Sequence, residues 1–139
     1  MKQELILWPF LLQVLLPILV LLVMAKRKSA DKKSGAFDPI RSALDNKAWS
    51  EGVVKTSNNL ANQFQVPVLF YALCLMAFSI EAVGPVFLSL AWAFVVTRYM
   101  HAYVHITTNV VPRRLMLFSV GVLILIAMIV ILAWSLAGL

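Results

Sequence analysis

Four long apolar runs constrain the fold of this chain more than any other feature. They cover about residues 5–25, 58–80, 86–107 and 114–137. Each is close to the ~20 predominantly apolar residues that an α-helix needs to cross the hydrocarbon core of a bilayer. Because a membrane-spanning segment must satisfy its own backbone hydrogen bonds, we expect an all-α membrane protein with four transmembrane helices in one bundle.

The composition excludes a soluble enzyme that merely carries a membrane anchor. The chain has 139 residues, of which 62% are hydrophobic and 13% are charged, unlike an ordinary soluble domain. No polar stretch is long enough to fold alone, so we expect a single membrane domain over residues 1–139. The first apolar run is also longer than the core of a cleaved signal peptide, and the positive cluster follows it, which favours a retained helix.

Positive charge gathers in the loop between the first two runs. Eight of the 12 Lys and Arg residues lie in the basic loop 26–57, two form Arg113-Arg114, and none lies between the second and third runs. The positive-inside rule then places the first and third loops in the cytoplasm and both termini outside. A nucleic-acid interface is the less favoured interpretation of the cluster. Because the cluster lies next to membrane spans, we expect it to act as a topology signal or to contact membrane lipids. We expect no binding to nucleic acid.

The basic loop contains a predicted surface helix. Asp38-Pro39 is typical of a helix start, with Asp38 as the N-cap and Pro39 in the first turn. Apolar residues fall on one side of this segment and Gly52 would end it. We therefore expect a short helix that lies on the membrane surface, with Trp49 near the interface.

The third apolar run carries an unusual polar face. Arg98, His101 and His105 are three and four positions apart, so they share one side of a helix. A charge in hydrocarbon costs at least ~2.5 kcal/mol, so this side must face the bundle, a wet cavity or the interface. Amides begin the second run, and the predicted topology brings them to the same membrane side. The convergence predicts one polar pocket, formed by Asn58, Asn59, Asn62, Gln63, Gln65, Arg98, Tyr99, His101, Tyr103, His105, Asn109, Arg113 and Arg114.

The chemistry of this predicted pocket is cationic. Arginines and amides predominate and no carboxylate belongs to it, which suits an anionic ligand with peptide-like groups or a lipid headgroup. A purely structural polar network at the bundle end is the alternative. His101 and His105 are spaced to share a metal, but the chain has only two histidines and no third ligand at hand. We therefore expect no metal.

Three segments of the chain form a recognisable pattern: Asn59-Leu-Ala-Asn62-Gln63-Phe-Gln65-Val-Pro67, Ala91 to Arg98 with His101 and His105, and Thr108-Asn109 with Arg114, Phe118 and Gly121. Together they resemble the MAPEG family, the membrane-associated proteins in eicosanoid and glutathione metabolism. The resemblance covers roughly residues 5–137 and is closer to the bacterial, uncharacterised branch than to the eukaryotic enzymes. It implies a homotrimer, here in a bacterial inner membrane, with glutathione bound between subunits near the cytoplasmic side.

The chain departs from the family pattern at positions whose side chains contact glutathione in the family's enzymes. The family's second helix carries a glutamate for the ligand's amino group, whereas this chain has Gln63 and Gln65. Two family tyrosines are replaced by His101 and His105. By the resemblance, Arg98 matches and the residues that could hold the ligand are Asn59, Asn62, Gln63, Gln65, Arg98, His101 and His105.

Two functions are expected from these observations. In the first, the protein is a glutathione-dependent transferase or peroxidase acting on lipophilic substrates. Arg113 or Arg114 would be its catalytic residue, since a cation lowers the pKa of a thiol from near ~8.5. In the alternative, the protein is a non-catalytic membrane module that binds a lipid or quinone, or a subunit of a larger membrane complex.

Overall fold

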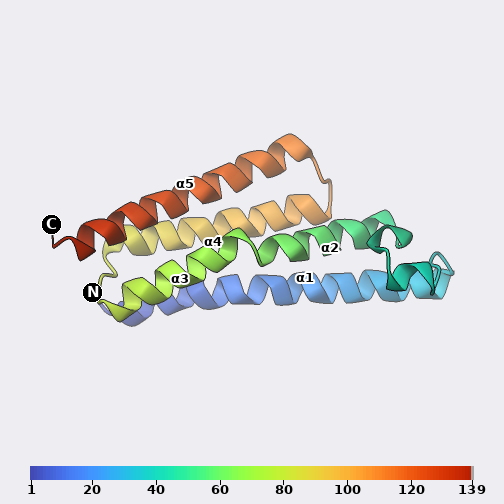
Figure 1. Cartoon of the computed structure of the whole chain (residues 1–139), viewed down its shortest axis with the longest axis horizontal. Coiled ribbons are helices and arrows are strands. Elements are labelled where there is room, and N and C mark those ends of the chain that lie inside the picture. The colour runs from blue at the N-terminus through green and yellow to red at the C-terminus, as the bar shows by residue number, and fades with distance from the viewer. Residues whose placement is uncertain (139) are drawn as a thin grey trace.

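The computed structural model describes residues 1–138 and is an antiparallel helical bundle (Figure 1). A short 3-10 helix, η1, leads into the longest helix, α1, and the chain returns along it through α2 and α3. α4 then runs outward and α5 returns, so that both termini lie at one end of the bundle. The elements are η1 (Gln3–Ile6), α1 (Leu7–Ser34), η2 (Arg41–Ala43), η3 (Asn46–Ala48), α2 (Glu51–Gln63), α3 (Val66–Ser79), α4 (Pro85–Ile106) and α5 (Val111–Leu136).

Three helical segments within residues 1–138 are long and apolar enough to cross a membrane. They are Gln3–Ser34, Glu51–Ser79 and Val111–Leu136. α4 is not among them, although its 22 residues run between the same two ends of the bundle (Figure 1). Its second half carries an arginine and two histidines, all of them buried. The all-helical membrane architecture is therefore confirmed, and α4 owes its lower apolar character to side chains that face inward.

The first helix is longer than the sequence analysis predicts. The basic loop is predicted to begin at residue 26, where the first apolar run ends, but α1 continues to Ser34. Lysine, arginine and alanine are good helix formers, and no breaker precedes Gly35. Gly35 ends the helix with φ +71°, and the Ala36 N–H donates to the carbonyl of Asp31 (3.1 Å). The predicted start of the basic loop is thus wrong, and its first basic residues extend a membrane helix beyond the apolar part.

The predicted surface helix is also wrong. Between α1 and α2 the chain forms only the single-turn helices η2 and η3. Asp38 does cap the backbone, because its Oδ1 accepts from the N–H groups of Ile40 (2.8 Å) and Arg41 (3.2 Å). Gly52 does not end a helix, because α2 already begins at Glu51, seven residues before the predicted start of the second span.

A break divides the second span into α2 and α3. The two helices are separated at Phe64 and Gln65, and Gln65 has φ −105° and ψ −105°. Pro67 lacks a backbone N–H, and in a continuous helix its ring would clash with the carbonyl of Gln63, four residues earlier. Pro67 instead lies in the first turn of α3, where a missing N–H is tolerated.

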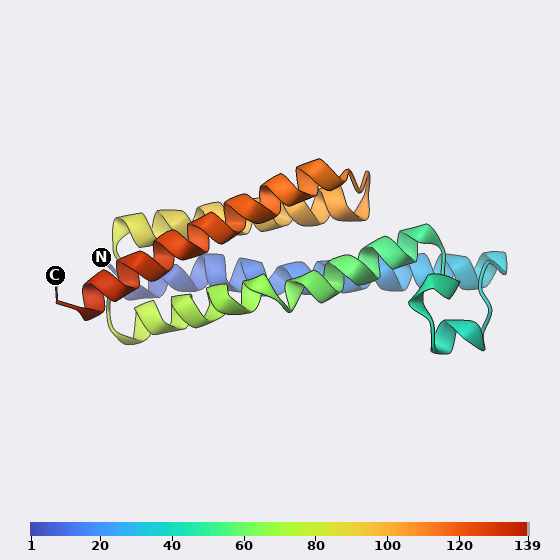
Figure 2. The ribbon, with the colours of Figure 1, turned by 45° about the horizontal axis from the view of Figure 1, so that its top comes forward.

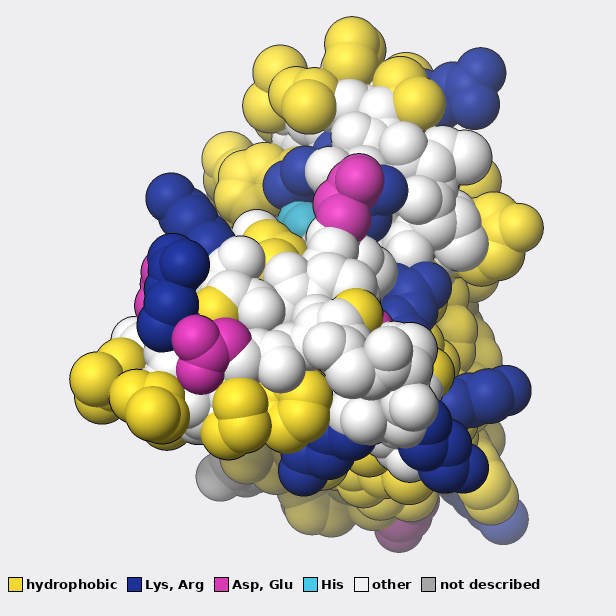
Figure 3. All heavy atoms as spheres, turned by 90° about the vertical axis from the view of Figure 1, so that its right-hand side faces the viewer, with side chains coloured by type: hydrophobic (Ala, Val, Ile, Leu, Met, Phe, Trp, Pro, Cys, Tyr) yellow, Lys and Arg dark blue, Asp and Glu magenta, His cyan; other side chains and the backbone are white. Residues whose placement is uncertain are grey.

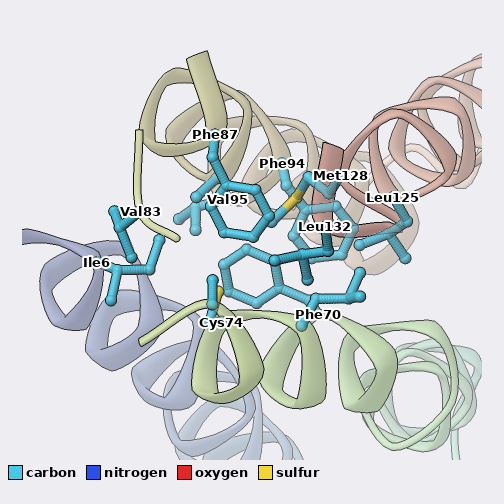
Figure 4. Close-up of a cluster of buried hydrophobic side chains, with 13 residues drawn as sticks. Ile6, Phe70, Cys74, Val83, Phe87, Phe94, Val95, Leu125, Met128 and Leu132 are labelled. Atoms are coloured by element: carbon cyan, nitrogen blue, oxygen red, sulfur yellow. The ribbon is translucent and has the colours of Figure 1, made fainter. Parts of the chain in front are cut away.

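The apolar core occupies the half of the bundle near the termini. Phe70 of α3 and Phe94 of α4 are fully buried and stack with ring centroids 4.6 Å apart (Figure 4). Cys74 lies beside them, buried and unpaired, as its position in an apolar run predicts. The other half of the bundle, toward the α1–α2 loop, holds most of the buried polar side chains. The fold thus separates a packed apolar half from a polar half.

Candidate functional site

The candidate site lies in the polar half of the bundle. α2 contributes amides and α4 contributes an arginine and two histidines, all with at most 2% of their surface exposed. The two helices meet directly, because Asn62 Nδ2 lies 3.4 Å from His105 Nε2. The start of the second span and the end of the third therefore come together in space. The buried members are Asn59, Gln63, Arg98, His101 and His105.

A pocket of about 190 Å³ opens beside these residues. α2 contributes one amide to its wall, α4 contributes His101, and the first turns of α5 close it. The wall therefore combines a cation, an imidazole and an amide with an apolar floor. Its lining residues are Asn62, His101, Val111, Arg114, Leu115 and Phe118.

The two arginines at the start of α5 have different positions. Arg114 lines the pocket, and its Nη1 donates to Oδ1 of Asn109 (2.7 Å). Asn109 adopts φ +54°, a conformation that asparagine tolerates better than most residues. Arg113 is exposed and does not line the pocket. Of the two predicted candidates, only Arg114 reaches the pocket.

Arg114 also retains donor capacity. Its Nε is buried and has no hydrogen-bond partner within residues 1–138. A buried polar group without a partner costs about 1–3 kcal/mol, and more when it is charged. The guanidinium is therefore held by Asn109 at Nη1 and lines the pocket, while its buried Nε is unsatisfied within residues 1–138.

The buried amides and imidazoles are only partly satisfied. Gln63 Nε2 donates to Oδ1 of Asn59 (3.1 Å), which leaves Asn59 Nδ2 and Gln63 Oε1 without partners in the described part of the chain. The rings of His101 and His105 lie 5.7 Å apart, and neither Nδ1 has a partner among these residues. Buried polar groups in folded proteins nearly always bind something, so this cluster is suited to contacts beyond the protomer's own side chains.

Arg98 is the most deeply buried charge. Its exposed fraction is 0%, and none of its three guanidinium nitrogens has a hydrogen-bond partner in the part of the chain that the structure describes. It does not point outward from the isolated protomer, as a lipid-facing arginine would. The guanidinium therefore lies inside this half of the bundle, as expected for a charge in an apolar run.

Some residues of the predicted pocket lie elsewhere. Asn58, Gln65 and Tyr103 are exposed on the outer surface of the protomer. The hydroxyl of Tyr99 donates to the carbonyl of Leu12 (2.7 Å), which joins α4 to α1. The pocket is thus smaller than the predicted set of residues.

Sequence reasoning missed the residue that fastens this end of the bundle. Arg27 Nη1 donates to the carbonyl of Gly52 (2.8 Å) and to Oγ1 of Thr56 (2.7 Å), and its Nη2 donates to the carbonyl of Ile106 (2.9 Å). One guanidinium thereby joins α1, α2 and the last turn of α4. Two of the three acceptors are backbone carbonyls, so no motif identifies them in the sequence.

Gln13 and Phe118 were missed as well. Gln13 of α1 is fully buried, and both of its amide atoms lack partners among residues 1–138. Its isolation in an apolar run was the available signal. Phe118 belongs to the segments that carry the family resemblance, but it was given no role in the predicted pocket; it lines the pocket one turn beyond Arg114. In the described residues, no three His, Cys, Asp or Glu side chains gather as they would around a metal.

Comparison with known proteins gives one family match. A family model described as the MAPEG family matches residues 5–134. No curated protein and no solved structure matches the chain.

Proposed function

Since the chain belongs to the MAPEG family, matched over residues 5–134, we propose that it binds glutathione in the Arg114 pocket and uses it on lipophilic substrates. The reaction would be addition of the glutathione S–H across an activated double bond of the substrate, or reduction of a hydroperoxide to an alcohol and water while two glutathione molecules are oxidised to the disulfide. The observation that carries this proposal is the position of Arg114. It is a half-buried cation on the pocket wall, held by Asn109, with Nε unpaired among residues 1–138.

The pocket residues suit an anionic thiol peptide. Glutathione supplies a thiol that is reactive as the thiolate. A guanidinium next to the thiol favours that form, which is the role proposed for Arg114. Asn62 and His101, which also line the pocket, offer hydrogen-bonding groups for the amides and carboxylates of the peptide.

One part of glutathione has no matching partner. Its ammonium group would be bound by a carboxylate, and the corresponding side chains here are the uncharged Gln63 and Gln65. Gln63 is instead engaged with Asn59. A charge-assisted hydrogen bond contributes about 1.5–3 kcal/mol, so its loss corresponds to roughly 10- to 150-fold in affinity. We therefore expect weak binding of glutathione.

The size of the pocket supports a site shared between subunits. Pockets for drug-sized ligands usually measure about 300–1,000 Å³, whereas one protomer provides about 190 Å³. A neighbouring copy would supply the remaining wall and could use the exposed Gln65 and Asn58. We propose a homotrimer on this basis, in line with the resemblance given above.

We also propose that the polar end faces the cytoplasm. The basic residues of α1, the α1–α2 loop and the α4–α5 turn all lie at the end opposite the termini (Figure 1). Figure 3 looks onto this end and shows Lys and Arg side chains gathered mainly around its edge. The positive-inside rule assigns such an end to the cytoplasmic side.

Calorimetry with two ligands tests the proposed function. Glutathione and an analogue with a methyl group in place of the thiol are titrated into the detergent-solubilised protein at several pH values. We expect both to bind, with glutathione gaining affinity over the analogue as pH rises, because only the thiol can ionise beside Arg114. An absence of heat from glutathione at millimolar concentration would refute the proposal.

A second candidate function has its own supporting observation. An apolar groove of about 280 Å³ lies between α1 and the end of α2, lined by Val14, Pro17, Ile18, Leu21, Leu60 and Phe64. Such a groove suits an acyl or isoprenoid chain, as in a non-catalytic lipid- or quinone-binding module. Native mass spectrometry of the purified protein distinguishes the two: a retained quinone or lipid without glutathione binding favours the module.

A further inference from the structure

The loop between α1 and α2, residues 36–50, is an ordered unit without regular secondary structure beyond two single turns. The rings of Phe37 and Trp49 stack with centroids 5.1 Å apart. Trp49 Nε1 donates to the carbonyl of Ser42 (3.3 Å), and Lys28 Nζ lies 4.8 Å from the centre of the Trp49 ring. Aromatic stacking and a cation–π contact therefore fasten this loop to the basic end of α1.

Two large aliphatic side chains project from this loop. Ile40 is 81% exposed and Leu44 is 92% exposed, the highest values among the large hydrophobic residues of the described part, residues 1–138. They lie on either side of η2, next to the exposed side chains of Arg41 and Lys47. A loop that encloses its aromatic residues while presenting two aliphatic ones has the composition of a membrane-contacting surface.

Helix geometry places the loop at the depth of the lipid headgroups. The apolar part of α1 ends at Ala25. At ~1.5 Å per residue, Lys28 lies about 4.5 Å beyond that point and Asp31 about 9 Å beyond it. The headgroup region extends roughly 5–8 Å beyond the hydrocarbon core on each side. Lys28 contacts the Trp49 ring, and Asp31 Oδ2 accepts from the Ser50 N–H (2.9 Å). The first of these two attachment points of the loop therefore lies within the headgroup layer, and the second lies just outside it.

The loop also turns back toward the membrane. Figure 2 shows it folded alongside the last turns of α1 instead of continuing beyond them. The charge of this region favours an anionic surface, because residues 26–55 contain eight Lys or Arg and four Asp or Glu. Basic residues next to a membrane span attract anionic lipids, and tryptophan is enriched at the same depth.

We propose that the α1–α2 loop is a membrane-surface anchor. Ile40 and Leu44 insert at the boundary between headgroups and acyl chains of an anionic leaflet, while Arg41 and Lys47 contact lipid phosphates. An anionic bilayer fits better than a protein partner because the loop is held at headgroup depth by contacts within the same chain. This inference does not depend on whether the Arg114 pocket binds glutathione.

Spin labelling tests the anchor. A nitroxide is attached to Leu44→Cys, and in a second variant to Ile40→Cys, in a Cys74→Ala background. Each protein is placed in nanodiscs of phosphatidylcholine alone or mixed with phosphatidylglycerol. Collisions with oxygen, which concentrates in lipid, are compared with collisions with a water-soluble nickel chelate. The control label is at Lys33→Cys, which is exposed near the end of α1.

The expected result is lipid exposure at both loop positions. In anionic nanodiscs the ratio of oxygen to nickel collisions at residues 40 and 44 should exceed that at residue 33 several-fold. Adding Arg41→Gln and Lys47→Gln should reduce the difference. Equal nickel access at residues 33, 40 and 44 in both lipid mixtures would overturn the proposal. So would labels that become shielded only when proteins extracted from native membranes are added, because that result indicates a protein partner.

Discussion

Replacing Arg27 by alanine should loosen the polar end of the bundle, because its guanidinium joins three helices there. It donates to Gly52, Thr56 and Ile106 at 2.7–2.9 Å. A hydrogen bond from a charged donor contributes about 1.5–3 kcal/mol. Such contributions within one network do not add fully. Removing the guanidinium also leaves neutral acceptors without a donor, which costs about 1–3 kcal/mol for each one that stays buried. Because Arg27 is half-buried, water can replace part of these bonds, and we expect a total loss near ~3 kcal/mol.

Two variants make this prediction specific. Arg27→Lys keeps the charge but cannot reach three acceptors with a planar fork, so it should lose an intermediate amount. Arg41→Ala removes an exposed arginine whose side chain donates no hydrogen bond within the described residues, and it should change stability by less than ~0.5 kcal/mol. Unfolding is followed by circular dichroism during titration from mild detergent into dodecyl sulfate. Equal midpoints for Arg27→Ala and Arg41→Ala would refute the reasoning.

Three further predictions concern the core, the ligand and the topology. Phe70→Ala should destabilise the protein by ~3–5 kcal/mol, because the ring is fully buried and stacked on Phe94, whereas Phe64→Ala, at a position 67% exposed, should have little effect in the same unfolding assay. Gln63→Glu should tighten glutathione binding in calorimetry by roughly 10- to 150-fold, because it supplies a carboxylate for the ammonium group, and unchanged affinity would show that this end of the ligand lies elsewhere. Cysteines at Asn58 and Thr108, both exposed, should react with an impermeant reagent only from the cytoplasmic side, so labelling from opposite sides would contradict the shared polar end.

The sequence was sufficient for the class of fold because the bilayer imposes strong rules. Long apolar runs must be helical, and a charge inside one of them must face inward. Arg98 follows this rule, with 0% of its surface exposed. The spacing of His101 and His105 likewise placed both on one buried face. These expectations required only helical periodicity and the cost of burying charge.

The predictions that were wrong concern where helices begin and end, which depends on competition between weak local conformational preferences. The end of α1 was expected at the change from apolar to basic residues, but hydropathy does not end a helix, and Gly35 does. Asp38 capped the backbone as predicted, yet only the single-turn helix η2 followed, because the stacked rings of Phe37 and Trp49 and the indole bond to Ser42 favour a compact loop. Isolated short helices are marginal, so such contacts decide the outcome.

The candidate site was predictable only in part. Arg113 and Arg114 are identical in type and adjacent, so only the rotation of α5 determines which one reaches the pocket. The Arg27 network was hidden because its acceptors are mainly backbone carbonyls, which every residue carries. Gln65 was grouped with its neighbouring amides, but the break before Pro67 turns it outward from the protomer.

Comparing Arg114→Gln with Arg113→Gln tests the central claim most directly. Both variants remove one arginine from the first turn of α5, but only Arg114 lines the pocket. Calorimetry with glutathione should show at least a ~10-fold loss of affinity for Arg114→Gln, the equivalent of one charge-assisted contact, and wild-type affinity for Arg113→Gln. Equal effects of the two substitutions, or a loss confined to Arg113→Gln, would contradict the assignment of this pocket as the ligand site.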